Sequence, residues 1–472
     1  MKGLEVMVIS KSELENENIT KRLDSEYFKK AILRNIEDIK NYENGYSKLN
    51  KYIRQLTGGA TPLGAEYEVA GVPFLRVQNI MQNYFNMDEI VYINHKQDKE
   101  IKRSRLKEND VLLTITGVSY GKSAVVPKGL ENANINQHSV RISLSKDIDP
   151  YFLSTFLNSR YGKLQSDKNI VGVTRPALDY DVIRNFNIPD CSFHFQKQIH
   201  SLLSKAETIS VNSKKIYHKA EKTLLQKLGL NTFKFDFANT NIKSFQECFV
   251  QFDRFDAEYY QPKFDQLREH LLQTGGAIKL GSDLSLNKRG TQPIYTDIQM
   301  GIPVLNSKHI RENRIEYSDI RFGILKDTNP ELVIRKNDVL INGTGVGTIG
   351  RSAVYQRDEP ALPDNHVTIL RTKNIDPLFL SVQLNSIIGK LQVEKYFKGS
   401  SGQIELYPAD IDEFIVWKAP TATQQEISAA IEESESLRLK FETILQLAQK
   451  AVEIAIEQGE DQAIAYINQN TE

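Results

Sequence analysis

Two stretches of this chain carry the same short phrases in the same order, about 228 residues apart. For example, Asn109-Asp-Val-Leu112 returns as Asn337-Asp-Val-Leu340. Between Arg22 and Gln198 of the first copy, the offset to the second copy stays within 227 to 232 residues, so the copies align with only small insertions. A repeat of this length is a whole domain with its connector rather than one unit of a solenoid. The chain is therefore expected to fold into two similar modules that contact two similar targets.

Length and composition predict a globular protein with two cores. The chain has 472 residues, enough for two domains of ordinary size, and its 40% hydrophobic and 25% charged residues are typical of globular proteins. No apolar stretch approaches the ~18 to 20 residues of a membrane span. The apolar patch in residues 1–10 is too short for a signal peptide. Cys191 and Cys248 are too few for a zinc site or a disulfide framework, so a reducing cytoplasm is the expected location.

Two segments, residues 190–230 and 420–458, are expected to form long helices, because apolar residues recur in both at alternating spacings of three and four. The whole chain has 60 basic and 60 acidic residues, but these two segments differ in sign. Residues 195–229 contain seven Lys against two Glu (net +5), whereas residues 420–458 contain seven Glu against three Lys or Arg (net −4). Opposite charges favour pairing of the helices as a coiled coil. Two amphipathic helices that each pack on their own module are the alternative.

The modules are predicted to be α+β, because strand-like runs such as residues 111–116 and 339–342 lie between turns and helical stretches without regular β-α-β alternation. Each is expected to be a compact α/β domain of similar size. The predicted organisation is an N-terminal arm (1–23), module one (24–189), the first long helix (190–230), a connector (231–255), module two (256–419), the second long helix (420–458) and a polar tail, helical or frayed (459–472).

A glycine-rich segment follows a predicted strand in each module. Residues 117–123 resemble a phosphate-binding P-loop but have three residues between the glycines where four are needed. The second copy, residues 345–352, has the right gap but Arg in place of Lys. Strand-like residues rather than a helix follow both copies, which argues against nucleotide binding. We expect a tight turn that brings Lys122 and Arg351 close to a phosphate group, with an ordinary hairpin turn as the alternative.

Other catalytic patterns are absent from the sequence. It contains no His-Glu-x-x-His pair, no Gly-x-Ser-x-Gly elbow and no methyltransferase fingerprint. His138 and His366 occupy equivalent positions in the two copies. We expect them to be strand-end residues hydrogen-bonded to the backbone rather than metal ligands, because no further ligands accompany them.

The order of these phrases, present twice, resembles the specificity subunit of type I restriction–modification systems. The similarity covers nearly the whole chain, although no single phrase is decisive. The phrases that carry it are Arg22-Leu-Asp-Ser-Glu-Tyr-Phe28, Arg254-Phe-Asp-Ala-Glu-Tyr-Tyr260, Leu56-Thr-Gly-Gly-Ala-Thr-Pro62, Val72-Pro-Phe-Leu-Arg-Val-Gln-Asn79 and Gly399-Ser-Ser-Gly-Gln403. One departure is Asn287-Lys-Arg-Gly-Thr-Gln-Pro293, which stands where module two would carry Gly-Gly-x-Thr-Pro, and it suggests that the two targets differ.

The resemblance implies that each module is a target recognition domain for one half of a split double-stranded DNA site. The long helices would form an antiparallel spacer that fixes the gap and docks two methyltransferase (modification) subunits. Such a subunit is not an enzyme: S-adenosylmethionine and ATP would act on the modification and restriction subunits, and no metal or cofactor is expected on this chain. The alternatives are the same DNA reader in another restriction or phage-defence machine, a non-DNA coiled-coil adaptor, and a nucleotide-dependent enzyme.

Base reading requires Arg or Lys for guanine and Asn or Gln for adenine on exposed loops. Each candidate by itself could equally be an ordinary solvated loop residue. The candidates in module one are Thr57, Thr61, Arg76, Gln78, Asn79, Tyr120, Lys122, Thr174 and Arg175. Those in module two are Lys288, Arg289, Asn306, Lys308, Asn342, Thr344, Arg351, Ser401 and Gln403.

Overall fold

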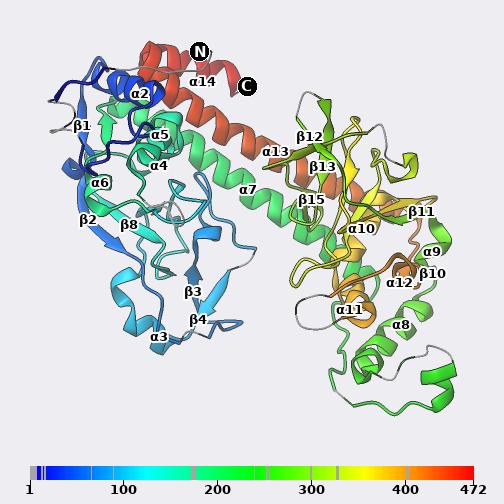
Figure 1. Cartoon of the computed structure of the whole chain (residues 1–472). Helices are drawn as coiled ribbons and strands as arrows, with labels where there is room; N and C mark the ends of the chain where they lie inside the picture. Colours follow the sequence, from blue (N-terminus) through cyan, green and yellow to red (C-terminus); the bar gives the residue numbers. More distant parts are fainter. Residues whose placement is uncertain are drawn as a thin grey trace. The chain divides into compact units, whose positions relative to one another are not determined.

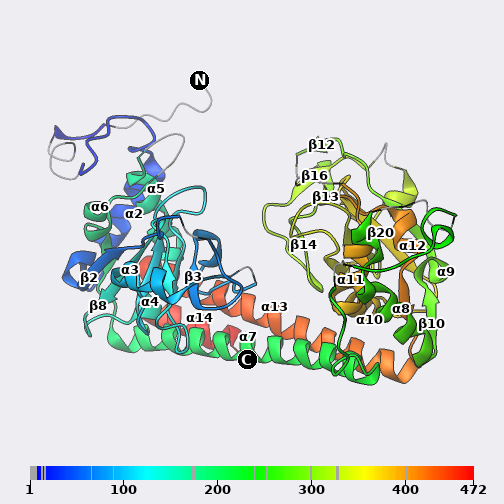
Figure 2. The ribbon, with the colours of Figure 1, turned by 90° about the horizontal axis from the view of Figure 1, so that it is seen from below.

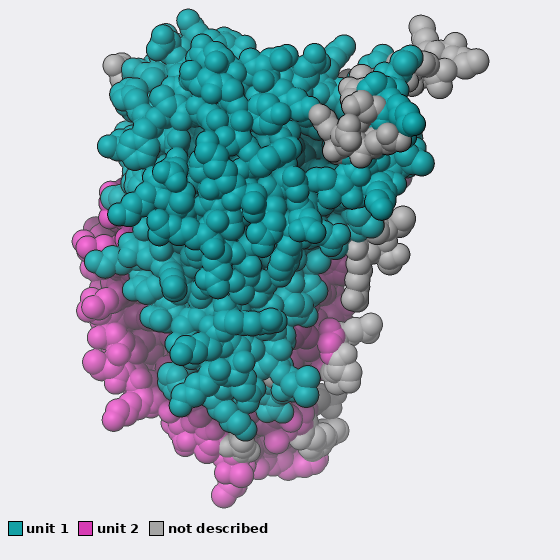
Figure 3. Space-filling model, turned by 90° about the vertical axis from the view of Figure 1, so that its left-hand side faces the viewer, with its two compact units in different colours: residues 1–210, 439–472 teal, residues 211–438 magenta. Residues whose placement is uncertain are grey.

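The computed structural model describes residues 8–471 except 12–13, 15–17, 65, 89, 172–176, 239, 251–253, 255, 298–299, 326–328, 400–401 and 403. Helix and sheet are mixed, as the sequence predicts (Figure 1). The chain divides into two compact units, one made of residues 1–210 and 439–472 and the other of residues 211–438 (Figure 3). No helix in the described part of the chain is both long and apolar enough to cross a membrane.

Unit 1 is built on an antiparallel sheet in the order β2-β8-β5-β6, with a second sheet in the order β4-β3-β7 and a β1-β9 pair. The strands are β1 (Tyr46–Lys48), β2 (Ile53–Gly58), β3 (Val72–Leu75), β4 (Val91–Ile93), β5 (Val111–Thr114), β6 (Ser123–Val125), β7 (Asn134–Ile135), β8 (Ser139–Leu144) and β9 (Asn187–Pro189). The α-helices before the first long helix are α2 (Lys30–Lys40), α3 (His95–Glu100), α4 (Pro150–Asn158), α5 (Arg160–Asn169) and α6 (Tyr180–Arg184).

Unit 2 repeats this plan. Its main sheet has the order β11-β20-β17-β18, and its second sheet has the order β12-β16-β13-β19. The strands are β10 (Ala277–Lys279), β11 (Leu284–Arg289), β12 (Tyr295–Thr296), β13 (Ile302–Leu305), β14 (Ile310–Arg311), β15 (Arg314–Ile315), β16 (Arg321–Gly323), β17 (Val339–Asn342), β18 (Ser352–Val354), β19 (Leu362–Pro363), β20 (Val367–Thr372) and β21 (Ile415–Trp417). The α-helices are α8 (Pro262–Thr274), α9 (Leu280–Asp283), α10 (Pro377–Asn385), α11 (Ile387–Tyr396) and α12 (Pro408–Asp412).

The repeat of the sequence is a repeat of the fold. In both main sheets the edge strand has a register shift after its first residue, between Ile53 and Gln55 of β2 and between Leu284 and Leu286 of β11. The strands β6 and β18 follow the glycine-rich segments directly, so a strand and not a helix comes after each of them. This geometry lacks the helix N-terminus on which a P-loop holds its phosphates.

Buried amides explain why some of the repeated phrases are so similar. In unit 1 the Asn158 side chain accepts a hydrogen bond from the Ser123 N–H (2.9 Å) and donates one to the Ser123 carbonyl (2.8 Å). In unit 2 Asn385 does the same with Ser352, at 3.0 and 2.8 Å. All four residues are buried. The two asparagines lie in Leu157-Asn-Ser159 and Leu384-Asn-Ser386, which are equivalent in the repeat. An unpaired buried polar group costs about 1–3 kcal/mol, so this Asn is a requirement of the fold in both units.

A second buried amide is also repeated. It belongs to the Gln of Gly162-Lys-Leu-Gln165 and of Gly389-Lys-Leu-Gln392, and it joins a helix to a strand. Gln165 in α5 exchanges two hydrogen bonds with the backbone of Asn187 in β9, at 2.7 and 3.0 Å. Gln392 in α11 exchanges two with the backbone of Ile415 in β21, at 2.6 and 3.0 Å. The buried amide therefore replaces the strand neighbour that β9 and β21 lack on that side.

Two long helices are present, α7 (Phe193–Lys227) and α13 (Thr421–Gln458). In unit 1 the first part of α7, including Ile199 and Ala206, shares a core with the last part of α13 (Figure 1 and Figure 2). In unit 2 the last part of α7 shares a core with the first part of α13, including Ile427. Ser213 interrupts the apolar stripe of α7, and its hydroxyl donates to the Ser434 carbonyl (2.7 Å) while Ser434 donates to the Ser213 carbonyl (2.9 Å). The Ser213 hydroxyl in the apolar stripe of α7 is thus hydrogen-bonded to α13.

The C-terminal segment, expected to be a polar tail that is helical or frayed, is the helix α14 (Glu460–Asn470). Ala463 and Ile467 are buried in the core of unit 1, and the Glu460 carboxylate accepts a hydrogen bond from the Tyr42 hydroxyl (2.7 Å). Gly459 precedes the helix with φ of 91°, a conformation that glycine adopts at little cost. Residues 460–470 are therefore part of the unit 1 fold.

Candidate nucleic-acid interface

Four segments of module one meet at one end of its main sheet, where β2 and β5 finish and β8 begins. The Leu75 carbonyl at the end of β3 accepts the Asn136 N–H (3.1 Å), and the Ala60 N–H after β2 donates to Ile135 (2.9 Å). The Ile115 N–H after β5 donates to His138 (2.9 Å). These bonds bring together the segments that contain the candidate residues Thr57, Thr61, Arg76, Gln78 and Lys122.

Module two gathers the equivalent segments. The Leu305 carbonyl at the end of β13 accepts the Asp364 N–H (2.9 Å), and the Gly343 N–H after β17 donates to His366 (2.8 Å). Gly290 after β11 donates to Val367 (2.9 Å). We call this end of each main sheet the loop end, defined in unit 1 by residues 57–61, 76–79, 115–122 and 136–138 and in unit 2 by residues 288–292, 306–309, 343–351 and 364–366.

A close backbone approach at the loop end requires glycine. A Cβ on Gly59 would lie 2.0 Å from the Asn136 carbonyl oxygen, and a Cβ on Gly290 would lie 2.3 Å from the Asp364 carbonyl oxygen. Gly59 and Gly290 are therefore structural equivalents. The departure at residues 287–293 thus keeps the one glycine that the fold needs, while Gly58 is replaced by Arg289.

The glycine-rich segments form tight turns at the loop end, as predicted. Gly117 and Gly121 have φ of 77° and 83°, and Gly345 and Gly350 have φ of 96° and 82°. The Thr114 hydroxyl accepts the N–H of Lys122 (2.9 Å) and closes the first turn. Lys122 and Arg351 are half-buried at the ends of these turns. Whether they contact phosphates remains a prediction.

A second turn follows β3 in module one and β13 in module two. The two turns have similar backbones and different side chains. The Asn79 side chain accepts the N–H of Arg76 (2.9 Å), and the His309 ring accepts the N–H of Asn306 (3.0 Å). Burial lowers the pKa of His309 to about 4, so its ring is neutral and Nδ1 can accept this bond. The residue that this turn exposes is Gln78 in module one and Lys308 in module two.

A threonine–histidine pair lies beside the glycine-rich turn in both modules. Thr116 Oγ1 and His138 Nδ1 are 2.6 Å apart, and Thr344 Oγ1 and His366 Nδ1 are 2.8 Å apart. Each histidine is hydrogen-bonded to the backbone through its carbonyl, which accepts the N–H of Ile115 or of Gly343, and its ring contacts the threonine hydroxyl in addition. No group of three or more His, Cys, Asp or Glu residues that could hold a metal ion occurs in the described part of the chain. Thr116 is not among the candidates predicted from the sequence, although its 228-residue spacing from Thr344 matches that of the two histidines.

The two modules differ at the residue that follows Thr57 in module one and Lys288 in module two. In module one this residue is Gly58, whose Cβ would lie 1.8 Å from the Tyr180 hydroxyl oxygen. In module two it is Arg289, which donates to the Gly343 carbonyl (3.0 Å), pairs with Glu405 (3.3 Å) and lies over the Tyr407 ring at 5.4 Å. Sequence reasoning selected Arg289 but missed Glu405 and Tyr407, because only the fold brings residues 289 and 405 together.

Several other candidates already have partners. Thr61 donates a hydrogen bond to the Gln137 side chain, Lys288 forms an ion pair with Glu331, and Arg76 lies over the Tyr67 ring at 5.6 Å. The Tyr120 hydroxyl donates to Asp167 (2.7 Å), and its burial together with this bond raises its pKa. Tyr120 therefore stays protonated and is tied to α5.

Two candidates are buried and serve the fold. Asn79 is 1% exposed and its amide donates to the Asn86 carbonyl (3.0 Å). Asn342 is 0% exposed and its amide donates to the carbonyls of Ser307 (3.0 Å) and Thr348 (3.2 Å). Neither side chain faces solvent, so we leave both out of the proposed interface.

The remaining candidates divide by position. The exposed ones are Thr61, Gln78, Lys288 and Lys308, and the half-buried ones are Thr57, Arg76, Tyr120, Lys122, Arg289, Asn306, Thr344 and Arg351. Thr174, Arg175, Ser401 and Gln403 lie outside the described residues. The bridges Thr116–Ala177 and Thr344–Glu405 nevertheless anchor the flanks of both of these segments at the loop end.

Part of the chain is similar to known proteins. Residues 50–222 match the family model of the type I restriction modification DNA specificity domain. The type I restriction enzyme EcoBI specificity subunit of Escherichia coli is 29% identical over 130 residues, which span 27% of each chain. The matched region is thus about a quarter of the length of this curated relative.

Solved structures of specificity subunits have a lower sequence identity to this chain. The S subunit of a type I restriction–modification system from M. genitalium is 12% identical, with 90% of this chain and 96% of that chain covered at a TM-score of 0.36. The HsdS subunit from Thermoanaerobacter tengcongensis is 14% identical, with coverages of 88% and 96% at a TM-score of 0.29. Residues 50–222 are thus similar to the DNA specificity domain of type I restriction–modification systems, and the curated relative that matches part of the chain is a specificity subunit of such a system.

Proposed function

We propose that this chain directs a type I restriction–modification complex to DNA, with each module contacting one half of a bipartite site through its loop end. The observation that carries the proposal is that the two loop ends share a backbone plan but differ in side chains. Gly58 is replaced by Arg289, and Gln78 is replaced by Lys308. A shared scaffold with different hydrogen-bonding groups is what two different half-sites require.

The long helices α7 and α13 are proposed to be an antiparallel spacer between the two target recognition domains, which would run over residues 24–189 and 256–419. The packing of α7 against α13 within each unit and the Ser213–Ser434 pair support this arrangement. At 1.5 Å per residue a helix of this length spans roughly 50 Å, or about 15 base pairs. The half-sites would be separated by bases that the protein does not contact.

The chain is proposed to be non-catalytic. It would bind two methyltransferase subunits that use S-adenosylmethionine, and in the full complex restriction subunits that use ATP. The strands after both glycine-rich turns support a role without nucleotide binding.

The experiment that tests the proposal is a methylation map. The chain is expressed with the methyltransferase subunit of the same genome in a host free of DNA methylation, and modified bases are then located by sequencing. A split motif that appears only with this chain is the expected result. Absence of any modification from a soluble complex of the two proteins would contradict it, and a split motif without restriction subunits in the genome would assign the reader to another defence machine.

The same map tests the modules one at a time. Arg289→Ala is expected to relax one base of the second half-site at a cost of about 1–3 kcal/mol in DNA binding, because one base contact is lost. The first half-site should stay unchanged. Lys128→Ala, an exposed change in module one, is the control and should leave both half-sites as they are. Relaxation of both half-sites by Arg289→Ala would contradict modular reading.

A further inference from the structure

The apex of each glycine-rich turn carries an exposed valine. Val118 is fully exposed and Val346 is 69% exposed. The two are 228 residues apart, so they occupy the same place in the repeat. Glycine, asparagine, aspartate and serine are the usual residues of exposed turns. A single exposed apolar side chain needs no explanation, but the same side chain at equivalent positions of two modules points to a contact with another molecule.

The backbone holds both valines at the second position of a hydrogen-bonded turn. The Tyr120 N–H donates to the Gly117 carbonyl (3.2 Å), and the Thr348 N–H donates to the Gly345 carbonyl (3.1 Å). Both glycines have a positive φ, 77° and 96°. The branched valine side chain also has few rotamers. Each turn therefore presents two methyl groups in a nearly fixed direction, and little conformational entropy is lost when they make a contact.

A second exposed apolar residue is repeated beside the first at the loop end. Leu63 follows Pro62 in module one, and Ile294 follows Pro293 in module two, so these two residues also occupy one place in the repeat. Both side chains are exposed. Each loop end therefore offers apolar as well as polar side chains to a partner.

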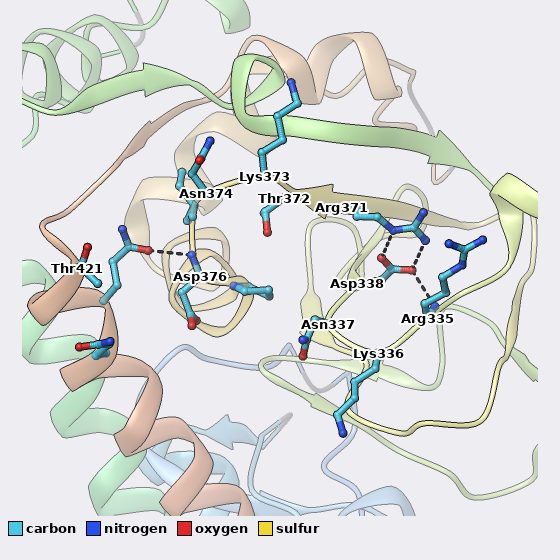
Figure 4. A pocket seen from close by; sticks show the side chains of 14 residues that line it. Arg335, Lys336, Asn337, Asp338, Arg371, Thr372, Lys373, Asn374, Asp376 and Thr421 are labelled. Carbon is cyan, nitrogen blue, oxygen red and sulfur yellow. Dashed lines mark hydrogen bonds and ion pairs between the residues drawn. The ribbon is translucent and has the colours of Figure 1, made fainter.

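The opposite end of the main sheet of unit 2 is polar. It forms a hollow of about 600 Å³ that is lined mostly by charged and amide side chains of residues 335–338, residues 371–377 and the first turn of α13 (Figure 4). Arg371 pairs there with Asp338, at 2.7 and 2.8 Å. None of the described residues that line this hollow is an exposed large apolar residue. Within the described part of the modules, the exposed apolar residues that recur at equivalent positions thus lie at the loop end.

The polar residues of the two loop ends differ, whereas these apolar residues are alike. Gly58 corresponds to Arg289, and Gln78 corresponds to Lys308. Different hydrogen-bonding groups suit different base pairs, but a shared apolar residue suits a chemical group that both half-sites present. The apolar group that a base pair presents in the major groove is the C5-methyl group of thymine. A valine at the apex of each turn is therefore suited to contact thymine.

We propose that Val118 and Val346 are specificity-determining residues, and that each packs on the C5-methyl group of a thymine in its half-site. This contact rests on the proposed function and requires a thymine at equivalent places of both half-sites. Lys122 and Arg351 end the same turns, so a phosphate contact by either cation would hold the apex at a fixed depth in the groove. A wedge between two stacked bases is the competing role, because apolar side chains also unstack DNA.

The test removes the methyl group from the DNA. The full chain in complex with its methyltransferase subunit is bound to duplexes of the mapped motif in which one thymine at a time is replaced by deoxyuridine. Deoxyuridine pairs in the same way but lacks the C5-methyl group. Fluorescence anisotropy at one salt concentration gives the Kd. One replacement in each half-site is expected to weaken binding about fourfold, which is the effect of burying one methyl group.

Alanine variants assign each methyl group to its valine. Val118→Ala should bind the thymine duplex about fourfold more weakly and show no further loss with deoxyuridine in the first half-site, because the apolar contact is already lost. The second half-site should keep its deoxyuridine effect, and Val346→Ala should show the reverse. Leu272→Ala, an exposed apolar change on α8, is the matched control and should keep both effects. Since these side chains are exposed, each variant is expected to keep the Tm of the wild-type chain.

Three results would overturn the inference. Equal weakening of the thymine and deoxyuridine duplexes by Val118→Ala would assign the valine to an unselective contact such as a wedge. Loss of the deoxyuridine effect in Leu63→Ala instead of Val118→Ala would assign the thymine to Leu63. The third is a half-site in which no thymine is sensitive to replacement by deoxyuridine. A wild-type complex that binds no split motif would instead contradict the proposed function, so the two failures can be told apart.

Discussion

Removal of the repeated buried asparagine should destabilise one unit at a time. Asn385 joins α10 to β18 through both backbone groups of Ser352 and also donates to the Ser381 carbonyl (2.9 Å). Asn385→Ala leaves the N–H of Ser352 buried without this partner, whereas the Ser352 carbonyl still accepts the N–H of Asn313 (2.8 Å). At about 1–3 kcal/mol for one unpaired group, the expected loss in the free energy of unfolding of unit 2 is about 2 kcal/mol. For a unit of this size that corresponds to a fall in Tm of about 4–8 °C.

Unfolding of unit 2 can be measured by intrinsic tryptophan fluorescence. Its single tryptophan, Trp417, is buried in the core of unit 2, so its fluorescence follows unfolding of that unit. Asn385→Ala should lower the Trp417 transition by the amount above. Asn158→Ala, the equivalent change in unit 1, should lower a transition seen by circular dichroism and leave the fluorescence transition in place. Asn231→Ala, an exposed change in unit 2, is the control.

Two results would refute this reasoning. A shift in Tm below about 2 °C for Asn385→Ala would show that the hydrogen bonds of the repeated Asn contribute little to stability. A Trp417 transition that moves equally with Asn158→Ala would show that the two units unfold as one.

Three further predictions concern the loop end, a buried charge and the spacer. Gly59→Val should weaken DNA binding by module one and destabilise unit 1 by about 2 kcal/mol or more, because its Cβ would overlap the Asn136 carbonyl. Urea unfolding measures the destabilisation, and an unchanged midpoint would contradict the close approach of Gly59 to Asn136. Lys395 is 9% exposed, and burial lowers its pKa to about 8. Between about pH 8 and pH 10.4 the folded state therefore binds fewer protons than the unfolded state, so the stability of unit 2 rises with pH in this range. Lys395→Met should therefore stabilise unit 2 by about 2 kcal/mol at pH 7, with a gain that shrinks above pH 8; a gain independent of pH would exclude the charge as its cause. Insertion of about one heptad into both α7 and α13 should lengthen the gap of the methylated motif and keep both half-sites, whereas an unchanged gap would refute the spacer.

Much of the fold follows from repetition and periodicity in the sequence. The repeated phrases predict two similar modules, since only a domain keeps its register over so many residues. The alternating three and four spacing predicts the regions of α7 and α13, because helical contacts are set by residues close in sequence. The strands after the glycine-rich turns were also predictable, from the β-branched residues that follow them.

Which polar residues face solvent can be seen only in the folded chain. Asn79 and Asn342 have the residue type of a base contact, yet both are buried, because their partners come from other turns. Arg289 and Glu405 are 116 residues apart and meet only in the folded module. Exposure and pairing depend on segments that are distant in the chain, and a local pattern carries no information about them. Repetition and periodicity are enough to predict two modules and two long helices, whereas contacts between distant segments select which residues at the loop end are exposed to another molecule.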